Sequence, residues 1–154
     1  MIYKPRHFSL QEMVCPHVFK KYGETAWQFM DDKLLMTVDL LRDQLGPIFG
    51  NNYDMPEEER VKRGLPLFDE RGFRCIQCSL VQIAIKDGTL YVSPHMTGQG
   101  FDCDVAGKTA AQVRLWIVAN EIKLPYPVRI EKNVTWLHID SRNAGQGKVF
   151  LFNN

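Results

Sequence analysis

The sequence predicts an α+β fold in which helices come first and antiparallel strands follow, and three observations support this. Before residue 46, apolar residues recur at spacings of three and four, as on one face of a helix. After residue 127, short β-branched and aromatic runs alternate with turn residues. With 154 residues, 45% of them hydrophobic, the chain can bury one core, so we expect a single domain over residues 1–154.

Capping signals place the helices. Ser9-Leu10-Gln11-Glu12 has the form of a capping box and predicts a short helix that ends before Pro16. The longest helix is expected from Thr25 to Leu45, where Gly46-Pro47 supplies stop signals. A second capping box, Thr109-Ala110-Ala111-Gln112, predicts a helix that runs to about Asn120.

Two segments between these helices are less regular. Asn51 to Leu67 is polar and contains prolines and glycines, which predicts a long loop with one helical turn. Long loops in small domains often serve function, so this one is a candidate lid or wall that sets specificity, or else a plain surface excursion. The apolar segment from Cys78 to Lys86 fits either a strand or a helix.

The strands follow from residue alternation. Gly100 to Val105 is expected to place Asp102 and Asp104 on the face opposite Phe101, Cys103 and Val105. Later strands are expected at Val128–Ile130, Thr135–Ile139 and Val149–Phe152, the first two joined by a turn at Lys132-Asn133. We therefore expect an antiparallel sheet with helices packed on one side.

Composition excludes several classes of partner. A net charge of +1 supplies no field for nucleic acid, and the basic pair Lys20-Lys21 is too short to count. The N-terminal residues lack the apolar stretch of a signal peptide, and no apolar run is long enough to cross a membrane. We expect synthesis in a cytoplasm without a signal peptide, no membrane insertion, and a monomer.

The four cysteines do not form the pattern of a disulfide framework and are expected to be reduced. Cys75-Ile76-Gln77-Cys78 contains two thiols at a spacing that suits a metal, and Cys15 and His17 offer two further donors. A second, structural zinc site is one interpretation of these four residues. Ordinary buried thiols are the other, because cysteine is often buried without any role.

His95, Asp102 and His138 are the candidate ligands of a catalytic metal. Catalytic zinc usually takes three ligands of the His, Asp or Glu type and keeps one position for water. Gly98 and Gly100 let the backbone turn sharply between His95 and Asp102. On a strand, Trp136, His138 and Asp140 would share one face, so Asp140 and Asp104 are candidate acceptors for the imidazole N–H groups. The alternative is that buried His and Asp residues only satisfy each other.

These residues carry a resemblance to a known family. The strings Ser93-x-His95-x-x-Gly98-x-Gly100-x-Asp102 and Trp136-x-His138-x-Asp140 resemble the signature of the zinc D-alanyl-D-alanine carboxypeptidases, whose fold is shared with the hedgehog signalling domain. The usual family form has Ala where this chain has Gly100. His7 to Glu12 resembles the N-terminal opening of the family, and Gly72-Phe73-Arg74 resembles its Gly-Tyr-Arg segment.

The resemblance implies a hedgehog/DD-peptidase fold, Zn²⁺ on His95, Asp102 and His138, and a peptidase that cuts D-amino-acid-containing stem peptides of bacterial peptidoglycan. Arg74 would grip substrate or stabilise the oxyanion, and Ser93 would line the pocket, although a Ser before Pro equally suits a local turn. Short phage members of the family lack a signal peptide. The resemblance thus implies a phage or prophage hydrolase that reaches the host cell wall with a holin or in the virion.

The general base is not part of the motif. Many family members have an acid three residues before the last ligand, and here that residue is Thr135, which cannot take a proton. Other branches place the acid on the preceding strand, where Glu131 is the nearest candidate, with Asp140 as the alternative. The main hypothesis is a zinc metallopeptidase of D,D-carboxypeptidase or endopeptidase type. The second is a zinc-stabilised wall-peptide-binding or virion structural module without catalysis.

Overall fold

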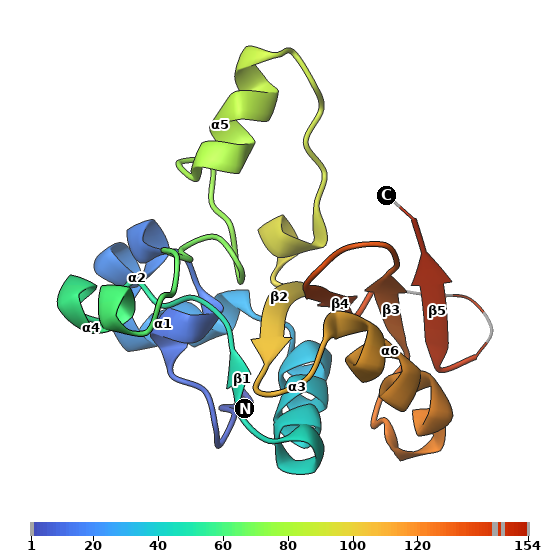
Figure 1. Cartoon of the computed structure of the whole chain (residues 1–154). Helices are drawn as coiled ribbons and strands as arrows, with labels where there is room; N and C mark the ends of the chain where they lie inside the picture. The colour runs from blue at the N-terminus through green and yellow to red at the C-terminus, as the bar shows by residue number, and fades with distance from the viewer. Residues whose placement is uncertain (1, 143–144, 146, 154) are drawn as a thin grey trace.

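A five-stranded mixed sheet runs through the computed structural model, which describes residues 2–142, 145 and 147–153 (Figure 1). The strand order is β1-β2-β4-β3-β5. The strands are β1 (Ile48–Phe49), β2 (Gly100–Val105), β3 (Val128–Glu131), β4 (Leu137–Asp140) and β5 (Val149–Phe152). The α+β class agrees with the sequence prediction, and so do the strands from Gly100 onward, except that β4 begins at Leu137 and not at Thr135.

The sheet is mixed and not wholly antiparallel, which corrects the prediction. Strands β2, β4 and β3 pair antiparallel, but β5 pairs with β3 in parallel. β4 ends at Asp140, beside the first residues of β3, and β5 begins at Val149, beside the same end of β3. Because β3 and β5 both start at this end of the sheet, the two strands run in the same direction.

Six α-helices and three short 3₁₀ helices complete the described part of the chain. The α-helices are α1 (Leu10–Met13), α2 (Pro16–Tyr22), α3 (Asp32–Leu45), α4 (Glu57–Lys62), α5 (Ser79–Lys86) and α6 (Ala110–Ala119). The 3₁₀ helices are η1 (Gly23–Phe29), η2 (Pro94–Thr97) and η3 (Glu121–Lys123). No helix of the described residues is long and apolar enough to cross a membrane.

Both predicted capping boxes are present. Ser9 and Glu12 exchange side-chain and backbone hydrogen bonds at the start of α1, and Thr109 and Gln112 do the same at α6. The predicted helix from Thr25 to Leu45 is wrong in its first part, since residues 23–29 form η1. The side chain of Asp31 accepts a hydrogen bond from the Leu34 N–H and starts α3 there.

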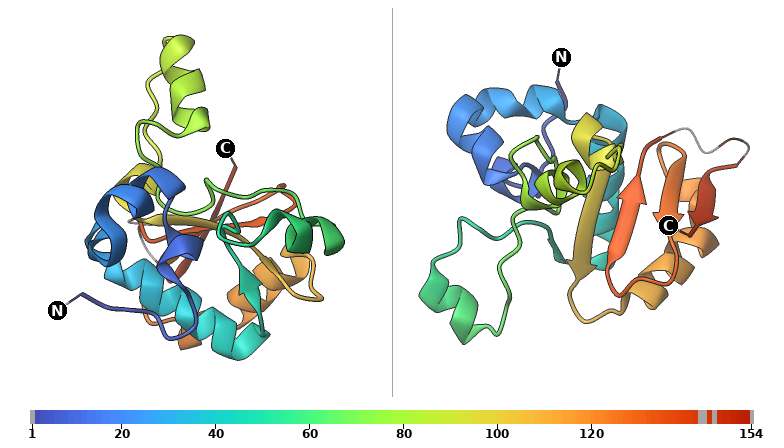
Figure 2. Two further views of the ribbon diagram at one scale, coloured as in Figure 1. Left: turned by 90° about the vertical axis from the view of Figure 1, so that its left-hand side faces the viewer. Right: turned by 90° about the horizontal axis from the view of Figure 1, so that it is seen from above.

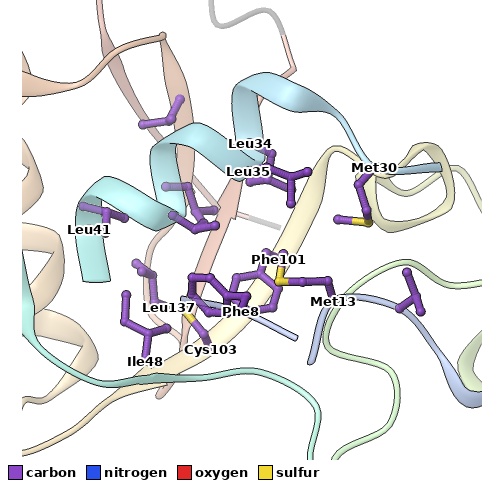
Figure 3. Packing of buried hydrophobic residues seen from close by; sticks show 14 of the residues in the cluster. Phe8, Met13, Met30, Leu34, Leu35, Leu41, Ile48, Phe101, Cys103 and Leu137 are labelled. Carbon is purple, nitrogen blue, oxygen red and sulfur yellow. The ribbon is translucent and has the colours of Figure 1, made fainter. Parts of the chain in front are cut away.

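The hydrophobic core lies between the sheet and the helices α3 and α6. Figure 3 shows Leu34 and Leu35 of α3 packed beside Phe101 of β2, near Leu137 of β4. Phe101, Cys103 and Val105 are buried, which confirms the predicted core face of β2. Helices α1 and α2 lie to the side of β2 (Figure 2). Asp102 and His138 lie on the opposite face of these strands, which does not pack against this core.

Two segments leave the body of the molecule. The loop from Asn51 to Leu67 contains α4, the single helical stretch that was predicted. The ambiguous segment from Cys78 to Lys86 is helical and forms α5, which projects away from the sheet (Figure 1). Val81 is the one buried residue of α5, so packing alone holds this arm weakly.

The carboxylate of Asp39 on α3 binds the N-terminal segment to the domain. It is buried and accepts hydrogen bonds from the Tyr3 hydroxyl, from the backbone N–H groups of Arg6 and His7, and from the Arg6 side chain. Burial raises the pKa of Asp39, but these donors outweigh it and hold the pKa below its ordinary value.

Asp39→Asn is therefore expected to lower the free energy of unfolding by about 2 kcal/mol at pH 7. Because the pKa of Asp39 is lower in the folded state, its ionised carboxylate stabilises the fold at pH values above its unfolded-state pKa of about 4. This stabilisation is lost as the pH falls through the folded-state pKa. Urea unfolding should show the deficit shrinking below about pH 4. The exposed control Asp87→Asn should match wild type, and an equal Asp39→Asn deficit at all pH values would contradict the charge explanation.

Candidate metal centre

Three elements bring His95, Asp102 and His138 together. Asp102 on β2 lies directly opposite His138 on β4 in the antiparallel register, so both side chains share one face of the sheet. His95 lies on η2, which ends at Gly98 in the left-handed conformation before β2 begins. All three residues are buried, with exposed fractions of 2% for His95, 8% for Asp102 and 6% for His138.

The ligand atoms are spaced as a metal would require. His95 Nε2 lies 3.3 Å from His138 Nδ1 and 3.3 Å from an Asp102 carboxylate oxygen. In a tetrahedron with zinc bonds of about 2.0–2.1 Å, neighbouring ligand atoms are about 3.3 Å apart. The remaining pair, His138 Nδ1 and Asp102 Oδ1, is closer at 2.6 Å, which is a hydrogen-bond distance. The donor set therefore fits a divalent metal such as zinc.

The surroundings of His95 select one tautomer. Its Nδ1 lies 2.8 Å from the Gly72 carbonyl oxygen, which can only accept, so Nδ1 carries the proton. Burial lowers the pKa of His95 and keeps the ring neutral. Its Nε2 lone pair is then directed at His138 and Asp102, as in a metal-binding imidazole.

His138 and Asp102 form a tightly coupled pair. Burial lowers the pKa of His138, but hydrogen bonds to Asp102 and Asp140 outweigh it and raise the pKa to about 9. The same contact, with help from His95, holds the pKa of Asp102 below its ordinary value despite its burial. Without a metal, a hydrogen bond joins His138 Nδ1 to Asp102 Oδ1, and a bound cation would displace its proton.

The three residues line a cleft of about 600 Å³, and Glu131 lines it too. Strands β3 and β4 pair Arg129 with Asp140 and Ile130 with Ile139. One further step of this register puts Glu131 opposite His138, on the same face of the sheet. Glu131, on the strand that precedes β4, therefore reaches the cleft. Thr135 lies outside the cleft, on a separate cavity.

Arg74 lines the cleft beside Asp102. Its guanidinium donates to the Asp102 carboxylate at 2.8 Å, to the Tyr91 hydroxyl at 2.8 Å and to the Glu70 carbonyl at 2.6 Å. Of its five N–H groups, two have no hydrogen bond recorded among the described residues. The cation is therefore fixed next to the ligand set and keeps donors for a bound group.

No family model, curated protein or solved structure matches this chain. The likeness to the zinc carboxypeptidases therefore rests on the motif residues, and what it implies for this chain stays a proposal.

The other predicted site residues fall into two groups. Ser93 lines the cleft and its hydroxyl also accepts from the His95 N–H, so both of its predicted positions are met. Asp140 lies 3.5 Å from His138 Nε2, which suits the predicted acceptor for that imidazole. The prediction for Asp104 is wrong, because its carboxylate pairs with Arg71 at 2.6 Å and not with an imidazole. The physical reason is its position two residues further along β2, beyond the reach of either ring.

The loop from Asn51 to Leu67 does not line this cleft, so the first of its two interpretations, a lid or wall of the site, is wrong. Its described residues line a different cavity, next to Ser9 and Phe49. The wall is formed instead by the segment from Leu90 to Pro94 and by Leu80 of α5. This segment therefore occupies the place that the loop was expected to fill.

Sequence reasoning missed three contributors. Tyr91 accepts from Arg74, Gly72 orients His95, and the Phe152 ring packs edge-on against His138 with centroids 5.9 Å apart. Tyr91 and Phe152 carry no motif that would single them out. Gly72 had a signal, because it opens the Gly72-Phe73-Arg74 string. The structure adds that a Cβ there would lie 1.9 Å from the Met13 carbonyl oxygen, so only glycine fits.

A second cluster of metal-ligand type lies elsewhere in the molecule. Cys15, His17, Cys75 and Cys78 offer ligand atoms that all lie within 4.8 Å of one another, and this set could hold a metal ion. A hydrogen bond from the Cys78 thiol lowers the pKa of Cys15 to about 5, while the same contact raises the pKa of Cys78. All four cysteines are free thiols, as expected.

Proposed function

We propose that this protein is a zinc-dependent peptidase and that the cleft around His95, Asp102 and His138 is its active site. The observation that carries the proposal is the convergence of these three ligand atoms, 2.6–3.3 Å apart, in a cleft that Glu131 also lines. Asp102, His138 and Glu131 come from the neighbouring strands β2, β4 and β3, and His95 is added from η2. This combination of metal ligands and a nearby acid is more consistent with hydrolysis than with a purely structural metal site.

His95 Nε2, His138 Nδ1 and an Asp102 oxygen would hold the zinc ion. When bound by such a set, zinc acidifies water and polarises a carbonyl oxygen. The Asp140 carboxylate faces His138 Nε2 and favours the proton there, so Nδ1 is left as the nitrogen that would bind the metal. In His95 the Gly72 carbonyl accepts from Nδ1, so Nε2 is the nitrogen that would bind the metal.

Glu131 is proposed as the general base. A carboxylate beside the reacting water can take its proton and return it to the leaving amine. Arg74 is proposed to stabilise the negative charge that develops on the carbonyl oxygen, because its guanidinium is always charged and is held rigidly by Glu70 and Tyr91. Its bond to Asp102 also keeps that carboxylate in position.

Peptidoglycan stem peptides are the proposed substrate. This rests on the resemblance of the motifs around His95 and His138 to the zinc D-alanyl-D-alanine carboxypeptidases. Arg74 and Arg142 line the cleft and supply cations for a peptide carboxylate. A volume of about 600 Å³ suits the end of a short peptide. A phage or prophage enzyme acting on the host wall, with a holin or in the virion, is the biological setting proposed by the same resemblance.

The test compares wild type with Glu131→Gln on purified peptidoglycan. Wild type should release new amino groups or free D-alanine, which also separates endopeptidase from carboxypeptidase action. Glu131→Gln should lower kcat at least about 100-fold while the zinc content stays at the wild-type value. Glu121→Gln, which changes an exposed glutamate on η3, is the matched control and should retain full activity.

Two results would overturn the proposal. If wild type loaded with zinc releases neither product from peptidoglycan, the chain is better explained as a wall-peptide-binding or virion structural module. If Glu131→Gln is as active as Glu121→Gln, the cleft uses a different base, and Asp140 becomes the residue to replace next.

A further inference from the structure

The cluster of Cys15, His17, Cys75 and Cys78 joins two parts of the chain that are far apart in sequence. Cys15 is the residue before α2, and His17 lies in the first turn of that helix. Cys75 and Cys78 come directly before α5, with Cys78 as its N-cap residue. The cluster therefore lies where the N-terminal helices meet the base of the projecting α5 arm.

The spacing of the donor atoms fits a tetrahedral zinc ion. With Zn–S bonds of about 2.3 Å and Zn–N bonds of about 2.0–2.1 Å, neighbouring ligand atoms are separated by about 3.5–3.8 Å. Cys78 Sγ and His17 Nδ1 are 4.0 Å apart, and all four donor atoms lie within 4.8 Å of one another. A contraction of at most about 1 Å between these atoms would complete the coordination sphere.

The backbone around the thiols is arranged as in a metal knuckle. The Cys78 N–H donates to the Cys75 carbonyl at 3.1 Å, which makes the tight turn. The Gln77 N–H donates to Cys75 Sγ at 3.4 Å, a contact that favours a thiolate. On the other side, the Cys15 N–H donates to the Phe73 carbonyl at 3.0 Å and fixes the two segments against each other.

Burial and donor type also favour a metal over unused thiols. Cys15 and Cys78 are fully buried, Cys75 is half-buried and His17 is exposed. Three thiols and an imidazole are soft donors that select zinc over calcium or magnesium. Four protein donors leave no open position, which is the arrangement of structural zinc sites and not of catalytic ones.

We propose that Cys15, His17, Cys75 and Cys78 bind a structural zinc ion that fastens the base of the α5 arm to the N-terminal helices. The arm needs such a fastening, because Val81 is its one buried residue while Leu80, Ile83 and Ile85 are exposed. Arg74 adjoins Cys75, so this ion would also hold the segment that carries Arg74 into the cleft. The proposal does not depend on peptidase activity.

Cobalt substitution of the full chain tests the proposal, because thiolate ligands give Co²⁺ a charge-transfer band in the near ultraviolet that His and Asp ligands do not. Wild type and His138→Ala should both show the band together with intense tetrahedral d–d absorption. Cys78→Ser should lose the band and about one equivalent of zinc. Cys103→Ser is the matched control, since it removes a buried cysteine outside the cluster and should keep both.

A second measurement uses wild type alone and so does not depend on the folding of any variant. Bound zinc should protect the half-buried Cys75 thiol from alkylation, and a chelator should restore its reactivity. The proposal is overturned if reduced wild type gives no thiolate band with cobalt, if zinc gives no protection, or if mass spectrometry of the freshly purified protein shows a disulfide between Cys15 and Cys78.

Discussion

Replacing His138 with alanine is expected to remove one equivalent of zinc from the protein and to abolish peptidase activity. His138 supplies one of three ligand atoms, and its Nδ1 lies 3.3 Å from His95 Nε2 and 2.6 Å from Asp102 Oδ1. Removing a ligand should weaken zinc binding at least about 100-fold, because even loss of an outer hydrogen-bond partner costs 10- to 100-fold. Elemental analysis after dialysis measures the loss.

His7→Ala is the control for this experiment. His7 pairs with Asp43 at the surface and belongs to neither ligand cluster, so its replacement should leave the zinc content unchanged. Cys78→Ser should lose zinc as well, but it should keep the His138-dependent equivalent. Retention of the full zinc content by His138→Ala would show that His95, Asp102 and His138 form a hydrogen-bonded cluster and no metal site.

Gly98→Ala is expected to destabilise the protein by about 3 kcal/mol or more. Gly98 has a φ of 70°, and a Cβ there would lie 1.8 Å from the Phe29 carbonyl oxygen. A backbone oxygen cannot move aside as a side chain would, and Asp31 further fixes Gly98 by donating to its carbonyl at 3.0 Å. Denaturant unfolding measures the loss.

Gly107→Ala separates the two causes of this effect. Gly107 has a nearly identical φ of 68°, but a Cβ there meets nothing within 4 Å. It should therefore show only the cost of the left-handed backbone, about 1 kcal/mol. Equal losses in the two variants would mean that the chain near Phe29 relaxes and that the close approach is not a constraint.

Local signals predicted much of this structure. The two capping boxes start α1 and α6 because each satisfies backbone donors within four residues. Alternation predicted β2 and which of its residues face the core. The positions of His95, Asp102 and His138 could be predicted because a glycine turn and a strand pairing join them.

Features set by contacts between distant segments could not be predicted. An apolar spacing continues through residues 25–45, yet Asp31 caps a new helix there and also accepts a hydrogen bond from Ser141. The parallel pairing of β5 with β3 depends on the end of the sheet at which β5 begins, and residue alternation within a strand does not set that end. The hydrogen bond from Arg74 to Tyr91 depends on the segment that follows α5. That segment has no apolar periodicity from which its position could be predicted.

The pairing of β3 with β4 has a consequence for insertions and deletions. Glu131 and His138 point to one side of the sheet because their separation along the hairpin is matched to its register. A single added or lost residue that the turn at Lys132-Asn133 did not absorb would rotate Glu131 into the core, whereas a change of two residues would restore its direction. Insertions and deletions in this hairpin should therefore be tolerated when they change its length by two residues, even at positions where the amino acid type is not important.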